Sequence, residues 1–109
     1  MSVSTIVYPV TDLNQAKAVY TALLGTPPTT DQPWYVGWHV DGQDIGLDPH
    51  GDVAAGPLAH HHVADIRATL AALLAAGATE RAGVRDVGGG KLVASVTDAD
   101  GNIVALLQG

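Results

Sequence analysis

The chain has 109 residues, which is the size of one ordinary domain and too short for two. Apolar residues make up 47% of it and charged residues 15%, a balance that excludes an intrinsically disordered chain. The formal net charge is −6, which argues against binding to nucleic acid or to an anionic membrane, because both need clustered lysine and arginine. The chain has no cysteine, so disulfides and thiolate metal sites are excluded.

The first half of the chain predicts a strand, a helix and a hairpin. Asp12 is a good N-cap for apolar residues at helical spacing, and Gly25 is a good C-cap. Asp41-Gly42 is a strong signal for a two-residue hairpin turn. The expected segments are a strand at 5–10, a helix at 13–24, a loop at 26–33, and strands at 34–40 and 43–48.

The second half predicts the same kinds of element in the same order. Asp65 is the expected N-cap of a second helix, and Gly77 is expected to end it. The expected segments are a connector at 49–57, a strand at 58–63, the helix from residue 66, a loop at 86–90, and strands at 92–97 and 102–108.

Short motifs also repeat between the two halves. Val10-Thr-Asp-Leu13 resembles Val63-Ala-Asp-Ile66, and each motif opens a predicted helix. Asp41-Gly42 and Asp100-Gly101 each precede a predicted strand. Two copies are too few for a solenoid, so we interpret the repeat as a duplication inside one domain. The expected domain spans residues 1–109, with modules at about 3–48 and 58–108 and a connector at 49–57.

The turn at Asp41-Gly42 sets the register of the first hairpin, and paired residues share a face. One face is apolar and is expected to pack against the helix; it holds Val36, Trp38, Ile45 and Leu47. The opposite face holds Tyr35, Gly37, His39, Asp44, Gly46 and Asp48. Because the glycines of this second face are expected to leave space, we predict a concave, polar surface that binds a ligand.

Alternation also separates the residues of the strand at 58–63. Leu58, His60 and His62 are expected on one face, with His61 on the other. In the last strand, Ile103, Ala105 and Leu107 alternate with Val104 and Leu106.

Taken together, these motifs resemble the vicinal oxygen chelate superfamily, which includes glyoxalases, bleomycin-resistance proteins and extradiol dioxygenases. The resemblance covers essentially the whole chain. It rests on segments that occur in the expected order: Tyr8–Leu13, Tyr20–Gly25, Val63–Ile66, Ala75–Ala78 and Asp98–Asn102. It implies an α+β fold in which two tandem βαβββ modules form curved mixed sheets around a cavity.

The resemblance also implies where a divalent metal would bind. Metal-dependent members place one ligand on the first and one on the last strand of each module. By the spacing from the shared motifs, those positions are Thr5, Gly46, Leu58 and Ala105. Glycine, alanine and leucine side chains cannot bind a metal ion, and one threonine is a poor ligand. We therefore expect neither the usual metal site nor a cofactor.

The histidines can each be interpreted in two ways. His60 and His62 could rebuild a displaced metal site with His39 or Asp44, or they could simply hydrogen-bond a ligand. His39 and Asp44 face each other across the hairpin, which fits either a general base with its orienting carboxylate or an ordinary cross-strand pair near a wet edge. We favour the ordinary pair.

The sequence thus predicts a metal-free, small-molecule-binding protein of sequestering or resistance type, with an unknown ligand. Its expected ligand contacts are Tyr35, His39, Asp44, Asp48, His60 and His62. The alternatives are a metal-dependent lyase, isomerase or dioxygenase using His60 and His62, and a non-catalytic interaction module. The resemblance further implies a homodimer. Because the chain starts without a signal peptide and has no run of ~18 apolar residues, we expect it in the cytoplasm and not in a membrane.

Overall fold

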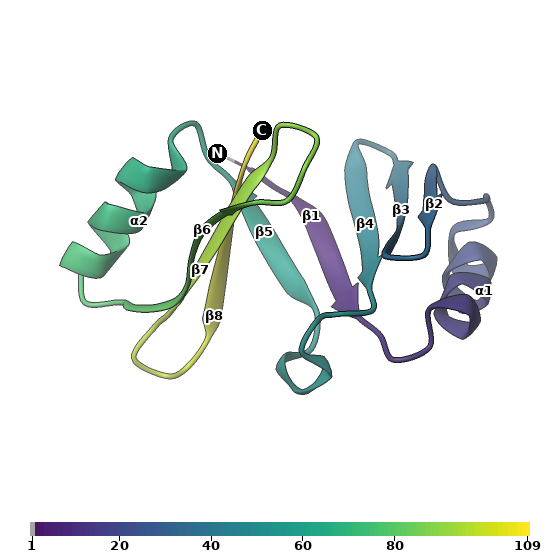
Figure 1. Cartoon of the computed structure of the whole chain (residues 1–109), viewed down its shortest axis with the longest axis horizontal. Coiled ribbons are helices and arrows are strands. Elements are labelled where there is room, and N and C mark those ends of the chain that lie inside the picture. Colours follow the sequence, from purple (N-terminus) through teal and green to yellow (C-terminus); the bar gives the residue numbers. More distant parts are fainter. Residues whose placement is uncertain (1) are drawn as a thin grey trace. The chain divides into compact units, whose positions relative to one another are not determined.

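The computed structural model describes residues 2–109. These residues form two compact units, one of residues 4–58 and one of residues 59–109 with the first residues of the chain. We place the module boundaries at the ends of strands and call residues 2–57 module one and residues 58–109 module two. In both, a strand and a helix are followed by three strands (Figure 1). The predicted α+β fold of two βαβββ modules is therefore confirmed.

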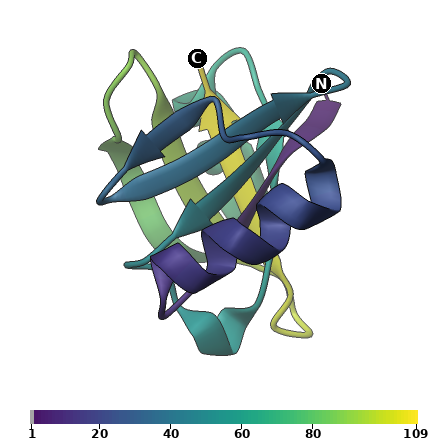
Figure 2. The same ribbon diagram turned by 90° about the vertical axis from the view of Figure 1, so that its right-hand side faces the viewer.

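Module one has one helix and a mixed four-stranded sheet. Its elements are β1 (Ser2–Pro9), α1 (Leu13–Leu24), β2 (Thr30–Gln32), β3 (Tyr35–Val40) and β4 (Gln43–Asp48). The strands lie in the order β2-β3-β4-β1, and β1 runs parallel to β4 while the other pairs are antiparallel. Figure 2 looks onto α1, which lies across one face of this sheet.

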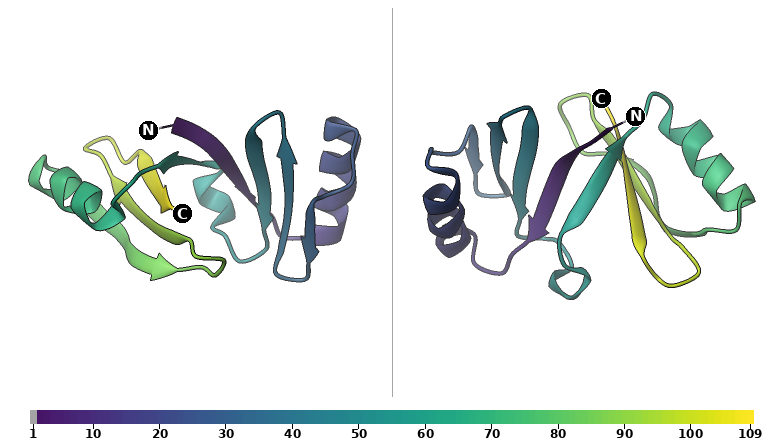
Figure 3. Two further views of the ribbon diagram at one scale, coloured as in Figure 1. Left: turned by 90° about the horizontal axis from the view of Figure 1, so that it is seen from above. Right: turned by 180° about the vertical axis from the view of Figure 1, so that it is seen from behind.

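Module two repeats that arrangement. A short 3-10 helix, η1 (Val53–Ala55), lies in the connector that leads to it. The elements of module two are β5 (Leu58–His62), α2 (Ile66–Ala75), β6 (Thr79–Asp86), β7 (Leu92–Thr97) and β8 (Ile103–Gln108). Its strands lie in the order β5-β8-β7-β6. Both views of Figure 3 show α2 along one side of these strands.

The pairing of the first and last strands is the same in both modules. Val7 pairs with Gly46 in module one, and His60 pairs with Ala105 in module two. Just beyond the strands, Val10 N donates to Asp48 O at 3.0 Å, and Val63 N donates to Leu107 O at 2.9 Å. In each module, the second contact lies three residues after the first contact on the side of the first strand and two residues after it on the side of the last strand. The predicted internal duplication requires this equal spacing.

Equivalent aspartates begin the two helices, as the sequence predicts. Asp12 Oδ1 accepts a hydrogen bond from Gln15 N, and Asp65 Oδ1 accepts one from Ala68 N, each at 3.1 Å. An N-cap carboxylate of this kind satisfies a backbone donor that has no partner inside the helix. Gly25 ends α1 in the left-handed conformation at φ 73°.

Each sheet packs its apolar face against its own helix. In module one, the buried residues are Val36, Trp38 and Leu47, with Tyr8, Tyr20 and Ile45 among those packed against them. Trp38 is 2% exposed, and its indole Nε1 donates to Thr26 O at 2.9 Å. In module two, the core contains Ile66, Leu70, Ala94, Val96 and Leu106. The predicted apolar faces are confirmed.

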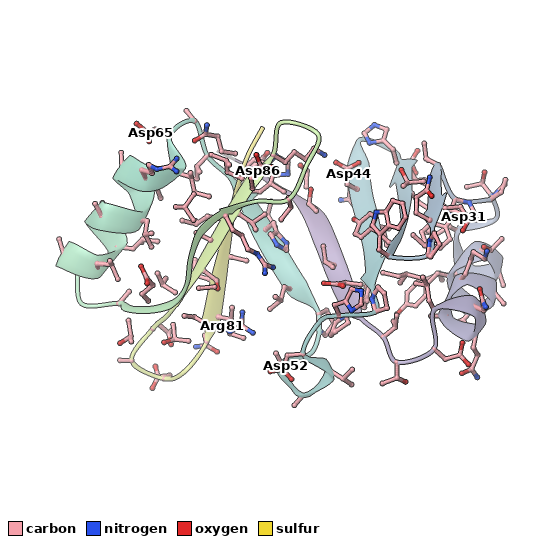
Figure 4. The ribbon with its side chains drawn as sticks, in the orientation of Figure 1. Asp31, Asp44, Asp52, Asp65, Arg81 and Asp86 are labelled. Carbon is pink, nitrogen blue, oxygen red and sulfur yellow. The ribbon has the colours of Figure 1, made fainter. Side chains whose placement is uncertain are left out.

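Two strands differ from the sequence prediction. Residues 26–33 were expected to form a loop, but residues 30–32 form β2 and pair with β3. Their polar side chains show no apolar alternation, and the strand is held by backbone pairing. Lys17 Nζ also forms an ion pair with Asp31 Oδ2 at 3.1 Å, and Figure 4 labels Asp31. Strand β6 occupies residues 79–86, where no element was predicted up to the loop at 86–90. Among residues 2–109, no helix is both long and apolar enough to span a bilayer.

Candidate functional site

The face of the first sheet that points away from α1 carries four of the six predicted ligand contacts. Pairing places Gly37 opposite Gly46 and His39 opposite Asp44, as the two-residue turn predicted. Both turn residues have positive φ, 53° at Asp41 and 76° at Gly42, which matches the twist of a tight hairpin. We call this surface the open face of module one; it holds Tyr35, Gly37, His39, Asp44, Gly46 and Asp48.

The glycines of this face do not leave empty space, contrary to the sequence prediction. The ring of Tyr35 lies over both of them. A Cβ atom on Gly37 would approach Tyr35 Cε2 to 2.9 Å, and a Cβ atom on Gly46 would collide with the Tyr35 hydroxyl. Tyr35 reaches this position because it stands two residues before Gly37 on β3, diagonal to Gly46 on β4. The glycines therefore form a shelf for an aromatic ring.

The surroundings of Tyr35 disfavour its phenolate, and the hydroxyl is protonated at neutral pH. Burial of the ring raises the pKa of the Tyr35 phenol above its ordinary value, because a buried phenolate loses hydration. The carboxylates of Asp44 and Asp48 raise this pKa further, since their negative charge disfavours a second anion. Tyr35 can therefore donate as well as accept a hydrogen bond.

His39 and Asp44 form the predicted pair across the hairpin. His39 Nδ1 lies 2.7 Å from Asp44 Oδ1, and the two side chains are 64% and 39% exposed. Figure 4 labels Asp44 on β4. This exposure matches the ordinary cross-strand pair that the sequence favoured, because a surface pair exchanges readily with water. A role as general base stays a prediction.

The other two predicted contacts lie on the corresponding face of module two. His60 pairs with Ala105 and His62 pairs with Leu107, on the side of the sheet that points away from α2. His61 pairs with Leu106 and lies on the helix side, as alternation predicted. We call the surface of His60 and His62 the open face of module two.

Sequence reasoning missed a polar contact on this second face. Ser95 is 4% exposed, and Arg81 Nη1 donates to its Oγ at 3.3 Å. The pairing of Arg85 with Val93 adds a second cation to the same face. Alternation along residues 92–97 could have assigned Ser95 to this face. Strand β6 pairs irregularly between Glu80 and Arg85, so alternation does not show which of its residues share the face of Ser95.

Comparison with known proteins identifies the family. The model of the Glyoxalase/Bleomycin resistance protein/Dioxygenase superfamily matches residues 2–106. The chain belongs to this superfamily. No curated protein sequence matches the chain significantly.

Solved structures with the superfamily fold resemble this chain over nearly its whole length. A hypothetical protein from Bacillus halodurans C-125 matches with a TM-score of 0.78 at 15% identity, over 99% of this chain and 94% of that one. A methylmalonyl-CoA epimerase from Mycobacterium tuberculosis matches with a TM-score of 0.71 at 18% identity, over 96% and 85%. A Mn(II)-bound glyoxalase from Novosphingobium aromaticivorans matches with a TM-score of 0.68 at 16% identity, over 96% and 38%. At such identities the likeness shows the fold.

The positions at which the superfamily resemblance places metal ligands do not fit a metal ion here. The space for a side chain at Gly46 is filled by Tyr35, and Ala105 is 2% exposed. The side chains at Gly46, Leu58 and Ala105 have no atom that can coordinate a divalent cation. Within the described part of each module, no three histidine or carboxylate side chains gather as a metal site.

Proposed function

We propose that this chain binds a small molecule without a metal ion, as a sequestering or resistance-like member of the glyoxalase/bleomycin-resistance superfamily. Similar folds belong to an epimerase and to a Mn(II)-bound glyoxalase, so the fold alone does not choose between binding and catalysis. The choice rests on the side chains that the two open faces carry.

The observation that carries the proposal is the Tyr35 ring on the glycine shelf. A metal ligand at position 46 would need the space that the Tyr35 hydroxyl occupies. The chain thus has a protonated phenol where the superfamily resemblance places a metal-binding group. A ring of this kind, with an apolar body and a polar tip, suits stacking and hydrogen bonding to a small organic ligand.

Six residues on two separate surfaces are the proposed ligand contacts. Tyr35, His39, Asp44 and Asp48 lie on the open face of module one, and His60 and His62 lie on the open face of module two. Hydrogen bonding by imidazole and carboxylate groups would orient the polar part of the ligand. We further propose that the protein acts as a homodimer in the cytoplasm, an expectation that comes from the superfamily and from the sequence.

Metal content tests the proposal most directly. Tag-free protein is analysed for metals as purified and after incubation with zinc, iron, manganese and nickel, because a histidine tag would itself bind these ions. We expect no stoichiometric retention of any of them. One equivalent of metal that disappears in His60→Ala or His62→Ala would overturn the proposal and support a metal-dependent lyase, isomerase or dioxygenase.

A ligand screen separates binding from a purely structural role. Protein-observed NMR with a library of small aromatic and polar compounds should move resonances of the open faces. If no compound moves them, the interaction-module alternative replaces our proposal.

A further inference from the structure

We propose that Tyr35 is the specificity-determining residue of the open face of module one, selecting ligands whose head group donates hydrogen bonds. Its phenol stands in for the side chain that Gly46 lacks. This inference rests on the proposed function and deepens it, because it names the residue that selects and the chemistry that it selects.

The position of the ring depends on the absence of two side chains. At Gly46 an added Cβ would collide with the phenol oxygen, and at Gly37 it would approach Cε2 to 2.9 Å. A side chain at position 46 and the Tyr35 ring on its shelf therefore exclude each other. The two glycines leave room for the hydroxyl end of the ring at a defined place on the strands, and a group already in place reduces the entropy lost when a ligand binds there.

The groups around that phenol are mostly hydrogen-bond acceptors. Asp44 and Asp48 are the two charged groups that interact with it electrostatically. His39 contacts one oxygen of Asp44, which leaves the other oxygen outside that pair. Carboxylates accept hydrogen bonds and carry negative charge, so a ligand carboxylate would meet like charge while an amide or amidinium group would meet partners.

The corresponding face of module two lacks this chemistry. The pairing that joins Gly37 and Gly46 in module one joins Ser95 and Ala105 in module two. Val93 and Leu107 pair next to them, where module one has Tyr35 and Asp48. We therefore expect the open face of module one, and not that of module two, to select ligands that donate hydrogen bonds.

Three probes of the same shape and different charge test the selection. Benzamidine, benzamide and benzoate are titrated into wild-type protein and followed by protein-observed NMR. We expect affinity to fall in that order, with shifts on β3 and β4. Tyr35→Phe should weaken benzamidine binding about threefold to tenfold, the value of one hydrogen bond. Tyr8→Phe, on the helix side of the same sheet, is the matched control and should change nothing.

The outcomes separate this inference from the proposed function. Binding that is equal in wild type and Tyr35→Phe, or stronger for benzoate than for benzamidine, overturns the inference and leaves small-molecule binding in place. Failure of all three probes to bind overturns the inference, and the wider ligand screen then decides the proposed function alone.

A second pair of variants tests the shelf without changing Tyr35. Gly46→Ala should displace the ring, bring the phenol pKa back towards its ordinary value and reduce benzamidine affinity as much as Tyr35→Phe does. Gly83→Ala is the control, since its Cβ would make only an ordinary contact of 3.7 Å with Glu80. Ultraviolet titration of the phenol, with Tyr35→Phe to assign its signal, reports the pKa. If Gly46→Ala does not fold, Gly37→Ala replaces it. An unchanged pKa and affinity in the folded variant overturns the inference.

Discussion

The two modules share one backbone plan and carry different chemistry on their open faces. The row of paired residues Gly37, Gly46 and Val7 in module one corresponds to Ser95, Ala105 and His60 in module two. The two glycines of the first row lie beneath the Tyr35 ring, and Ser95 in the second row accepts a hydrogen bond from Arg81. Equivalent pairing of the inner strands thus supports an aromatic, acidic surface in one module and a histidine-bearing surface with arginines in the other.

The helix-facing sides differ far less. Leu47 of module one and Leu106 of module two occupy equivalent positions, 0% and 2% exposed. Trp38 and Val96 also correspond, and both are buried. Burial against a helix favours side chains with a large apolar part, whereas the open face accepts more varied chemistry. The comparison shows that the two modules differ mainly on the face that the helices do not cover, which is the face where we propose the ligand contacts.

Charge follows the same division. Module one has six aspartates and one lysine, while module two has five acidic and four basic residues. Most of the net charge of −6 therefore belongs to module one. Attraction of a cationic or hydrogen-bond-donating ligand is expected there.

The strongest test of the comparison removes the equivalent core leucines. Leu47→Ala and Leu106→Ala should each lower the free energy of unfolding by about 2–5 kcal/mol, because each leaves a cavity in a packed core. Chemical denaturation followed by circular dichroism measures this. Both variants should shift one common transition, as expected for a single domain. Two transitions, each moved by only one of the variants, would contradict that expectation.

A smaller difference is expected between the open faces. Tyr35→Ala should cost about 2 kcal/mol, because the ring covers glycine backbone and is partly buried. Val93→Ala, at the equivalent position of β7, should cost about 1 kcal/mol, since fewer apolar atoms are removed. The same denaturation experiment compares them. Equal losses would show that the shelf adds nothing to the stability of module one.

Removal of the N-cap aspartate should destabilise the two helices by similar amounts, although the start of α2 has one further contact. Asp12→Ala and Asp65→Ala should each cost about 1 kcal/mol through loss of the N-cap. Helix α2 has an additional acceptor, Gln108 Oε1, which receives a hydrogen bond from Ile66 N at 2.8 Å. The equivalent position in module one is Pro49, whose side chain has no oxygen. Gln108→Ala should therefore lower stability by about 1 kcal/mol, and unchanged denaturation would rule out that contribution.

The turn before the last strand of module two should lose stability in acid. Hydrogen bonds from Asn102, through its side chain and then its backbone, lower the pKa of Asp98 below its ordinary value. A lowered pKa in the folded state contributes stability above the ordinary pKa, and this stability is lost as pH falls through that value towards the lowered one. Wild type should therefore lose slightly more stability on acidification than Asp98→Ala. Thermal melts from neutral pH to about pH 3 measure the difference, and parallel curves would contradict it.

Much of the fold was predictable from local signals. Asp12, Asp65 and Gly25 mark helix ends, and Asp41-Gly42 marks a hairpin, because each acts through neighbouring backbone. The strands at residues 30–32 and 79–86 were not predicted. Neither shows clean apolar alternation, since each is held by pairing with one neighbour and has exposed side chains.

The candidate site was predictable in part. Alternation placed His60 and His62 together, and the turn placed His39 beside Asp44. The position of the Tyr35 ring was missed, because a side chain that crosses to a neighbouring strand depends on rotamers and on the space left by glycines. The contact of Arg81 with Ser95 was missed because bulged pairing changes which face a residue occupies.

The amino-acid sequence by itself determined that each half of the chain runs through a strand, a helix and a pair of strands, and it determined the register of the first hairpin and which of these residues face the helices. These properties depend on periodicity and on turns, which act over a few residues. Only the tertiary structure decided that the glycines of the open face carry the Tyr35 ring instead of an empty pocket. That outcome depends on contacts between side chains and backbone on neighbouring strands. Such contacts do not produce a regular spacing of residue types along the sequence.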